Sequence, residues 1–140
     1  MDEFNKRGIQ VLGVSIDDAE SHANWRNTAI NEGGIGPVKY PLLCDEDRSM
    51  TKAYDVLHEE TTFAMRGTFL IDKEGMVQSQ TVNNLPLGRN IDEVLRMFDA
   101  LEFLATSGMV CPDGWAPGKP GMEPTAEGVA SYLADNASSL

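Results

Sequence analysis

A short apolar run followed by a helical stretch restricts the folds open to this chain. Residues 9–16 are almost uniformly apolar, as expected of a strand buried on both faces in an α/β sheet. Asp17 and Asp18 follow and are placed to cap a helix over about 19–31, which the glycine pair at 33–34 ends. The order of strand, cap, helix and glycine stop therefore predicts an α/β protein.

Three more elements follow before residue 90. Val38 to Leu43 is a second candidate strand, and a short helix is expected near 48–55, after a solvated acidic turn that caps it. The segments 68–71 and 76–82 predict a β-hairpin, with Gly75 suited to the left-handed position of its turn.

The last third of the chain predicts a helix, an irregular arm and a second helix. Apolar residues recur at helical spacing after Asn90, which together with Glu93 forms a box-like cap, and Gly108 stops that helix. Four prolines and three glycines within 112–124 exclude regular structure there, and Thr125 caps a final short helix.

Composition and charge exclude several classes of partner. The 140 residues carry a formal net charge of -11, spread without a block of one sign. Such a surface repels phosphate backbones and anionic headgroups, so no nucleic-acid or membrane partner is expected. No apolar run approaches the roughly 20 residues that span a bilayer, and two cysteines are too few for a secreted disulfide scaffold. A cytoplasmic location is expected.

No metal or cofactor is expected from the motifs. Asp45, Glu46 and Asp47 do not continue into a calcium loop, because Met50 stands where glycine is needed. Residues 33–37 lack the Lys-Ser/Thr of a phosphate loop. The two histidines and two cysteines show no zinc-ligand spacing; they are His22, His58, Cys44 and Cys111.

The two cysteines receive different interpretations. Cys111 lies just past the long helix and before Pro112, Asp113 and Gly114, which indicates an accessible, reactive thiol, with burial as the alternative. Cys44 ends a predicted strand and is interpreted as a buried core thiol. Trp25 and Trp115 are interpreted as packing residues.

Arg66 is one of few cations in an acidic chain and stands at the start of a strand. By position alone a solvated arginine is favoured. The functional alternative is that its permanently charged guanidinium holds a thiolate or an oxyanion through charge-assisted hydrogen bonds.

Six segments in register resemble a typical two-cysteine peroxiredoxin, most closely the bacterial alkyl hydroperoxide reductase C type. They are Gly8 to Ser15, His22 to Trp25, Gly33 to Gly36, Arg66 to Asp72, Asn84 to Arg89, and Val110-Cys111-Pro112 with Trp115. The order and spacing agree from about residue 4 to residue 133.

The resemblance implies a thioredoxin-like fold and a thiol peroxidase that acts on hydrogen peroxide and alkyl hydroperoxides. In the family a peroxidatic cysteine attacks peroxide and becomes sulfenic acid, which a resolving cysteine of the partner subunit captures as a disulfide. Cys111 matches the resolving cysteine, and Arg66 matches the arginine that stabilises the thiolate and orients peroxide. A homodimer, possibly a decamer, is implied, with thioredoxin or a flavoprotein disulfide reductase as electron donor.

One departure from the family is large. The peroxidatic signature Pro-x-x-x-Thr-x-x-Cys occurs nowhere in the 140 residues, and Cys44 cannot replace it because Pro41 stands where the threonine would be. The chain is expected to be an N-terminally truncated peroxiredoxin that lacks the N-terminal strands and the peroxidatic-cysteine loop.

Truncation also has consequences for the fold. In the thioredoxin-like sheet that the resemblance implies, the absent strand lies between those expected at 9–16 and 68–72, so the middle of the sheet is expected to be missing. Residues 1–107 are expected to form a partial thioredoxin-like domain, and 108–140 a C-terminal arm with the resolving cysteine and the terminal helix. The alternative functions are a non-catalytic truncated subunit that acts as an oligomerisation or interaction module, and an atypical thiol protein that uses Cys111 alone.

Overall fold

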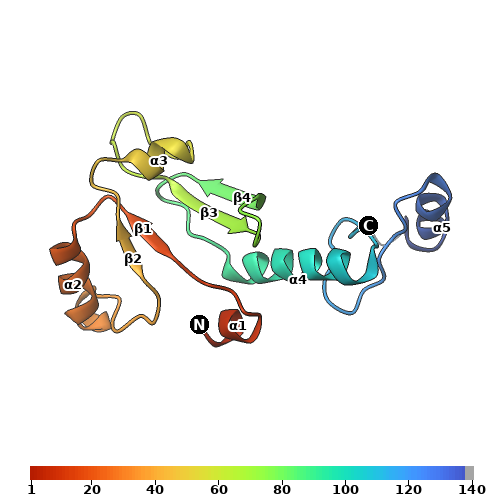
Figure 1. The fold of residues 1–140 in the computed structure, drawn as a ribbon, viewed down its shortest axis with the longest axis horizontal. Coiled ribbons are helices and arrows are strands. Elements are labelled where there is room, and N and C mark those ends of the chain that lie inside the picture. The colour runs from red at the N-terminus through yellow and green to blue at the C-terminus, as the bar shows by residue number, and fades with distance from the viewer. Residues whose placement is uncertain (138–140) are drawn as a thin grey trace. The chain divides into compact units, whose positions relative to one another are not determined.

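The computed structural model describes residues 1–137 and contains helices and strands in mixed order (Figure 1). It divides into two compact units. The first comprises Met1–Thr68 and Gln80–Arg89, and the second comprises Phe69–Ser79 and Asn90–Leu140. The hairpin thus has its base in one unit and its tip in the other. The division at residue 108 that the sequence favours stays a prediction.

The first unit contains the strand-helix arrangement predicted from the sequence. Strand β1 (Gly13–Ser15) leads into helix α2 (Ala19–Asn27), and strand β2 (Leu42–Cys44) returns parallel to β1. The register pairs Gly13 with Leu42 and Ser15 with Cys44, so both strands end at the same edge. Near the N-terminus a short helix, α1 (Asp2–Lys6), precedes β1.

Both strands are shorter than the apolar runs predict, and β1 is not buried on both faces. Val14 is 44% exposed and Leu12, just before β1, is 55% exposed. Among the described residues β1 pairs with β2 alone, so no second neighbour covers its other edge. Strand β2 begins only after Pro41, whose ring nitrogen has no N–H to contribute to a ladder.

Helix α2 begins as predicted and ends earlier. The Asp18 carboxylate accepts a 2.7 Å hydrogen bond from the Ser21 N–H, which confirms the predicted cap. At Thr28 the backbone becomes extended, and a separate 3₁₀ helix, η1 (Ile30–Glu32), follows. Gly33 then takes a left-handed φ of 92°, so the glycine stop is confirmed for η1 rather than for α2.

The acidic turn before α3 (Ser49–Ala53) caps the helix as predicted, but Asp45 is not solvated. It is only 2% exposed. Its carboxylate accepts hydrogen bonds from the N–H groups of Met50 and Thr51 at 2.9 and 2.7 Å and from the Thr51 hydroxyl. Burial alone would raise the pKa of Asp45, but the hydrogen bonds from Thr51 and Met50 outweigh it and hold the pKa below its usual value.

Replacing this buried anchor tests its contribution to stability. Asp45→Ala leaves the Met50 and Thr51 donors without their acceptor, and we expect a loss of about 1–3 kcal/mol in the free energy of unfolding. Because the pKa of Asp45 is lower in the folded state, its contribution is complete above an unfolded pKa of about 3.9 and is lost as pH falls through the folded pKa.

Urea unfolding of the parent chain and of Asp45→Ala at pH 7 and at pH 3 measures the difference in their free energies of unfolding. This difference should be smaller at pH 3. The control is Asp47→Ala, because Asp47 is exposed and accepts one 3.0 Å bond from the Ser49 N–H. An equal loss in both variants would contradict the anchoring role of Asp45.

The hairpin is confirmed. Strand β3 (Arg66–Ile71) pairs with β4 (Val77–Asn83) in a two-stranded sheet. The turn places Gly75 at a φ of 85°, and the Asp72 N–H donates to the Met76 carbonyl at 2.9 Å. The strands expected at 9–16 and 68–72 therefore belong to separate sheets, as predicted.

The second unit contains the long helix and the terminal helix. Helix α4 (Ile91–Ser107) is capped by the side-chain Oδ1 of Asn90, which accepts from the Glu93 N–H at 3.2 Å, and it ends at Gly108, whose φ is 70°. Both Glu93 carboxylate oxygens accept from Arg96, so Glu93 does not complete a reciprocal capping box. Helix α5 (Ala126–Asn136) begins at the predicted Thr125 cap.

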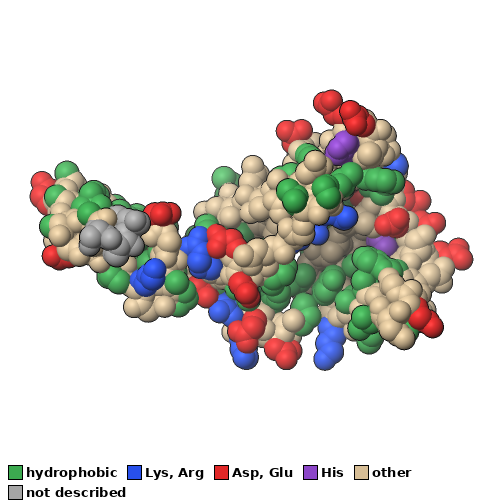
Figure 2. Space-filling view, turned by 180° about the vertical axis from the view of Figure 1, so that it is seen from behind, with side chains coloured by type: hydrophobic (Ala, Val, Ile, Leu, Met, Phe, Trp, Pro, Cys, Tyr) green, Lys and Arg blue, Asp and Glu red, His purple; other side chains and the backbone are tan. Residues whose placement is uncertain are grey.

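Few side chains are fully buried, and many large apolar side chains reach the surface. The buried apolar residues among those described are Val56, Ala100 and Trp115. Figure 2 shows hydrophobic side chains next to acidic ones on the visible face. Within residues 1–137, the helices are too short or too polar to cross a bilayer.

Candidate functional site

Cys111 lies three residues after Gly108, which ends α4, in an arm that folds back on that helix. The main chain of Val110 bridges to Met122 through N–H to carbonyl bonds of 2.8 and 2.9 Å in the two directions. This bridge brings Cys111 against the helix, where its Sγ donates to the Ala100 carbonyl at 3.7 Å. The thiol is half-buried, between the accessible thiol that the sequence favours and the buried alternative.

The surroundings of Cys111 favour the protonated thiol. Partial burial raises the pKa of Cys111, and the positive charge of Arg96 opposes this rise. The thiol is therefore a weak nucleophile at neutral pH until it leaves the Ala100 carbonyl or meets a reactive sulfur partner.

Trp115 holds the arm in place. It is the largest fully buried side chain and is 2% exposed, which confirms the packing role predicted from the sequence. Its ring lies 4.9 Å from that of Phe103, centroid to centroid, and its Nε1 donates to the Lys119 carbonyl at 3.1 Å. Arg96 donates to the Trp115 carbonyl at 2.7 Å while it pairs with Glu93, so α4 binds both the ring and the main chain of the arm.

A glycine allows the arm to approach α4 closely. A Cβ at Gly121 would lie 2.5 Å from the Phe103 ring and 2.9 Å from the Met109 Cβ. Only glycine fits this approach, which keeps Val110 and Met122 opposite each other. The region that the sequence predicts to be irregular is thus irregular but packed.

Arg66 and Arg89 form a cationic pair in the first unit. The exposed Arg66 guanidinium donates from Nε to the Leu85 carbonyl at 3.1 Å, and Arg89 donates to the Gly67 carbonyl and to the Thr68 hydroxyl at 3.1 Å. Desolvation and the charge of Arg66 lower the pKa of Arg89. Two guanidinium groups held this way attract an anion.

The sequence did not single out Arg89. Its signal was only its place at the end of the 84–89 segment that carries part of the family resemblance. Cys111 and Arg66, the two predicted site residues, belong to different compact units.

Cys44 is exposed, so the prediction of a buried core thiol is wrong. As expected, Cys44 is the last residue of β2, which is only a short strand. Its Sγ lies 3.5 Å from Nδ1 of His22, a residue whose chemistry the sequence did not indicate. Among residues 1–137, no three His, Cys, Asp or Glu side chains are grouped so as to hold a metal ion.

Comparison with known proteins identifies the family. A family model described as the AhpC/TSA family matches residues 1–80, and one described as the C-terminal domain of 1-Cys peroxiredoxin matches residues 100–134. Alkyl hydroperoxide reductase C of Helicobacter pylori is 49% identical over 138 residues, which cover 99% of this chain and 69% of that protein. Peroxiredoxin-2 of Cricetulus griseus is 42% identical, over 94% of this chain and 67% of that protein.

A solved structure gives the same result for the fold. The reduced 2-Cys peroxiredoxin of Plasmodium vivax superposes with a TM-score of 0.92 at 43% identity, covering 95% of this chain and 68% of that one. The fold and the thiol arm therefore define a thioredoxin-like thiol peroxidase. The chain belongs to the AhpC/TSA family, the peroxiredoxins, and it spans about two thirds of the length of these relatives.

Proposed function

We propose that Cys111 is the resolving cysteine of a peroxide-reducing cycle that begins at a cysteine outside these 140 residues. In that cycle a peroxidatic thiolate attacks the peroxide, breaks its O–O bond and becomes sulfenic acid, while the alcohol or water leaves. The Cys111 Sγ then attacks the sulfenic sulfur. A disulfide forms and water leaves with the Cys111 proton.

The observation that carries this proposal is the environment of the Cys111 thiol. It donates to the Ala100 carbonyl, and burial raises its pKa, so it suits the second step of the cycle better than the first. A first nucleophile needs a stabilised thiolate, whereas a resolving thiol needs only to reach a sulfur that is already oxidised.

Arg66 is proposed to stabilise the peroxidatic thiolate and to orient the peroxide. The support is its geometry, because the bond to Leu85 fixes one edge of the guanidinium and Arg89 adds a second positive charge. Partner subunits in a homodimer or decamer, a cytoplasmic location, and thioredoxin or a flavoprotein disulfide reductase as the electron donor belong to the same proposal.

A peroxide-consumption assay tests the proposal. We expect no turnover by this chain alone. We expect turnover when it is mixed with H. pylori alkyl hydroperoxide reductase C whose cysteine corresponding to Cys111 is replaced by serine, in the presence of that protein's reducing system. Turnover by this chain alone would contradict the requirement for an outside nucleophile. Failure of the mixture would instead favour a non-catalytic interaction module.

The role of Arg66 is tested in a protein that contains both this chain and the proposed peroxidatic cysteine. Arg66→Met should lower the rate constant for reaction with peroxide by about 10²-fold, the usual cost of removing one donor to a developing oxyanion. Arg26→Met is the control, because the Arg26 guanidinium donates to the Val38 carbonyl in another part of the first unit.

A further inference from the structure

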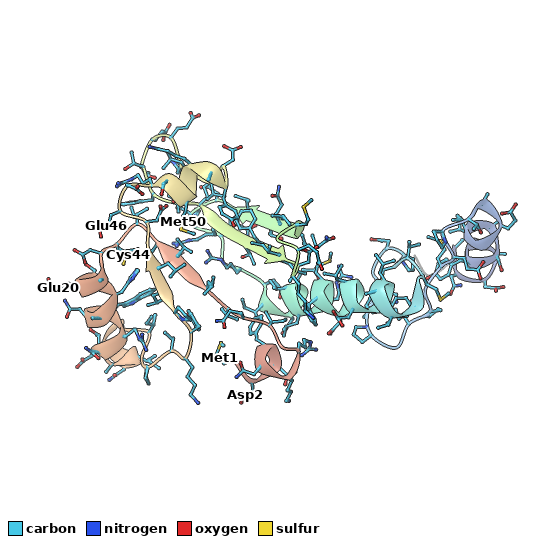
Figure 3. The ribbon with its side chains drawn as sticks, viewed as in Figure 1. Met1, Asp2, Glu20, Cys44, Glu46 and Met50 are labelled. Atoms are coloured by element: carbon cyan, nitrogen blue, oxygen red, sulfur yellow. The ribbon has the colours of Figure 1, made fainter. Side chains whose placement is uncertain are left out.

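Cys44 is the second thiol of the chain, and the peroxidase cycle gives it no role. It is exposed at the end of β2, and the strand register places it opposite Ser15 at the end of β1 (Figure 3). Helix α2, which starts four residues after Ser15, brings His22 to the same edge. His22 is 6% exposed, so the ring is buried while the sulfur beside it is open to solvent.

The hydrogen bonds around His22 determine which ring nitrogen carries the proton. The Ser15 hydroxyl donates to the Asp17 carboxylate at 2.7 Å and therefore accepts from Nε2 of His22, 2.6 Å away. Nε2 thus holds the proton in the neutral ring. Nδ1 carries the lone pair and faces the Cys44 Sγ at 3.5 Å, within hydrogen-bond reach for sulfur.

This arrangement has the parts of an activated nucleophile. Cys44 is the attacking group, Nδ1 of His22 is the base in contact with it, and the Ser15 hydroxyl orients the ring. The carboxylate of Asp17 supports the hydroxyl, and Asp18 lies close enough to His22 for electrostatic attraction. Both carboxylates place negative charge near the ring that takes the thiol proton.

The charge around the sulfur favours one class of reaction partner. Cys44 is followed by the buried Asp45 and the exposed Glu46 and Asp47, and Asp17 is exposed near the same edge. A small cationic molecule approaches such a surface more readily than an anionic one. A carboxylate-bearing disulfide is repelled, whereas an amine-bearing disulfide is attracted.

We propose that Cys44 and His22 form a second thiol site, which undergoes thiol–disulfide exchange with small disulfides that carry amino groups. The Cys44 proton passes to Nδ1 of His22 as Sγ attacks one sulfur of the disulfide. The old S–S bond breaks, the new S–S bond forms, and the departing thiolate takes the proton from His22. Cys44 is thereby oxidised to a mixed disulfide, and half of the reagent is reduced to a thiol.

The first test measures the role of His22. In a Cys111→Ser chain, which leaves Cys44 as the single thiol, we expect cystamine to modify Cys44 roughly tenfold faster than the same thiol in urea. Intact mass and peptide mapping locate the adduct. His22→Gln should slow the reaction in the folded chain by about 10²-fold, the usual contribution of a positioned base. A matched Cys44→Ser chain measures Cys111 alone, which should react slowly.

The second test separates the base from a merely structural histidine. Ser15→Ala removes the acceptor that orients the ring and should slow modification, whereas Ser15→Thr keeps a hydroxyl and should restore the rate. Circular dichroism establishes that the fold of each variant is unchanged. The rate of Cys44 modification in urea should be equal for all variants, which establishes that the total thiol is unchanged. A folded His22→Gln chain that reacts at the parent rate would overturn the proposal, and so would equal rates for Ser15→Ala and Ser15→Thr.

The third test concerns the class of partner. At low salt, cystamine should react on the order of tenfold faster than glutathione disulfide, and the difference should shrink as salt screens the charges. Bis(2-hydroxyethyl) disulfide, which is neutral, should fall between them. A faster reaction with glutathione disulfide would contradict the assignment of an amine-bearing partner.

Discussion

A disulfide-linked heterodimer is expected when this chain is mixed with intact peroxiredoxin subunits and treated with one equivalent of hydrogen peroxide. The intact subunit is H. pylori alkyl hydroperoxide reductase C with serine at the position that corresponds to Cys111, so that its sulfenic acid has no resolving thiol of its own. Cys111→Ser in this chain should abolish the heterodimer, because no other thiol lies in the arm. Non-reducing electrophoresis and peptide mapping measure the product.

Cys44→Ser is the matched control, because it removes the other thiol and leaves the arm intact. The heterodimer should form in this variant to the same extent. A heterodimer that survives Cys111→Ser and disappears with Cys44→Ser would transfer the resolving role to Cys44 and contradict the proposed cycle.

Trp115→Ala is expected to destabilise the second unit by about 3–5 kcal/mol, the cost typical of removing a large aromatic from a packed site. The ring is 2% exposed and contacts Phe103, so its removal leaves a cavity between the arm and α4. The same change should free Cys111 from the Ala100 carbonyl and speed its alkylation by iodoacetamide. Urea unfolding and the alkylation rate of a Cys44→Ser chain measure the two effects.

Trp25→Ala is the control of the same residue type. Trp25 is 45% exposed and donates one hydrogen bond from Nε1 to the Gly33 carbonyl at 3.1 Å. Its loss should cost less than that of Trp115 and should not change the alkylation of Cys111. If Trp115→Ala alters neither stability nor alkylation, the arm is not held by this ring.

Local signals in the sequence predicted the capped ends of the elements well. Asp18, Asn90 and Thr125 each accept from the backbone N–H of the residue three positions later, and each was recognised from residue type and position alone. The hairpin was predictable for the same reason, since Gly75 satisfies a backbone requirement that its turn imposes. These features depend on neighbours in the sequence.

Burial was predicted less well because it depends on distant neighbours. The run 9–16 looked like a doubly covered strand, yet β1 has one strand partner among the described residues and Val14 is 44% exposed. Asp45 was expected in solvent but is buried by the donors of α3. For the same reason the sequence favoured an accessible Cys111 and a buried Cys44, whereas Cys111 is half-buried and Cys44 is exposed.

The candidate site shows the same division. Cys111 and Arg66 could be proposed from their motifs, whereas the Cys44–His22 pair joins residues 22 positions apart. A signal for it did exist, because two parallel strands that end together place Ser15 and Cys44 side by side and a helix after the first strand returns to that edge. Reading that signal requires the strand register, which the sequence does not state.

Because Trp115 is buried, its fluorescence emission reports on the position of the arm. One indole is enclosed by protein while the other, at Trp25, is open to water, so the two emit at different wavelengths. In a Trp25→Phe chain the remaining emission comes from the enclosed ring alone. Release of the whole arm from α4 moves this ring toward solvent, so that release can be followed in real time without an attached label.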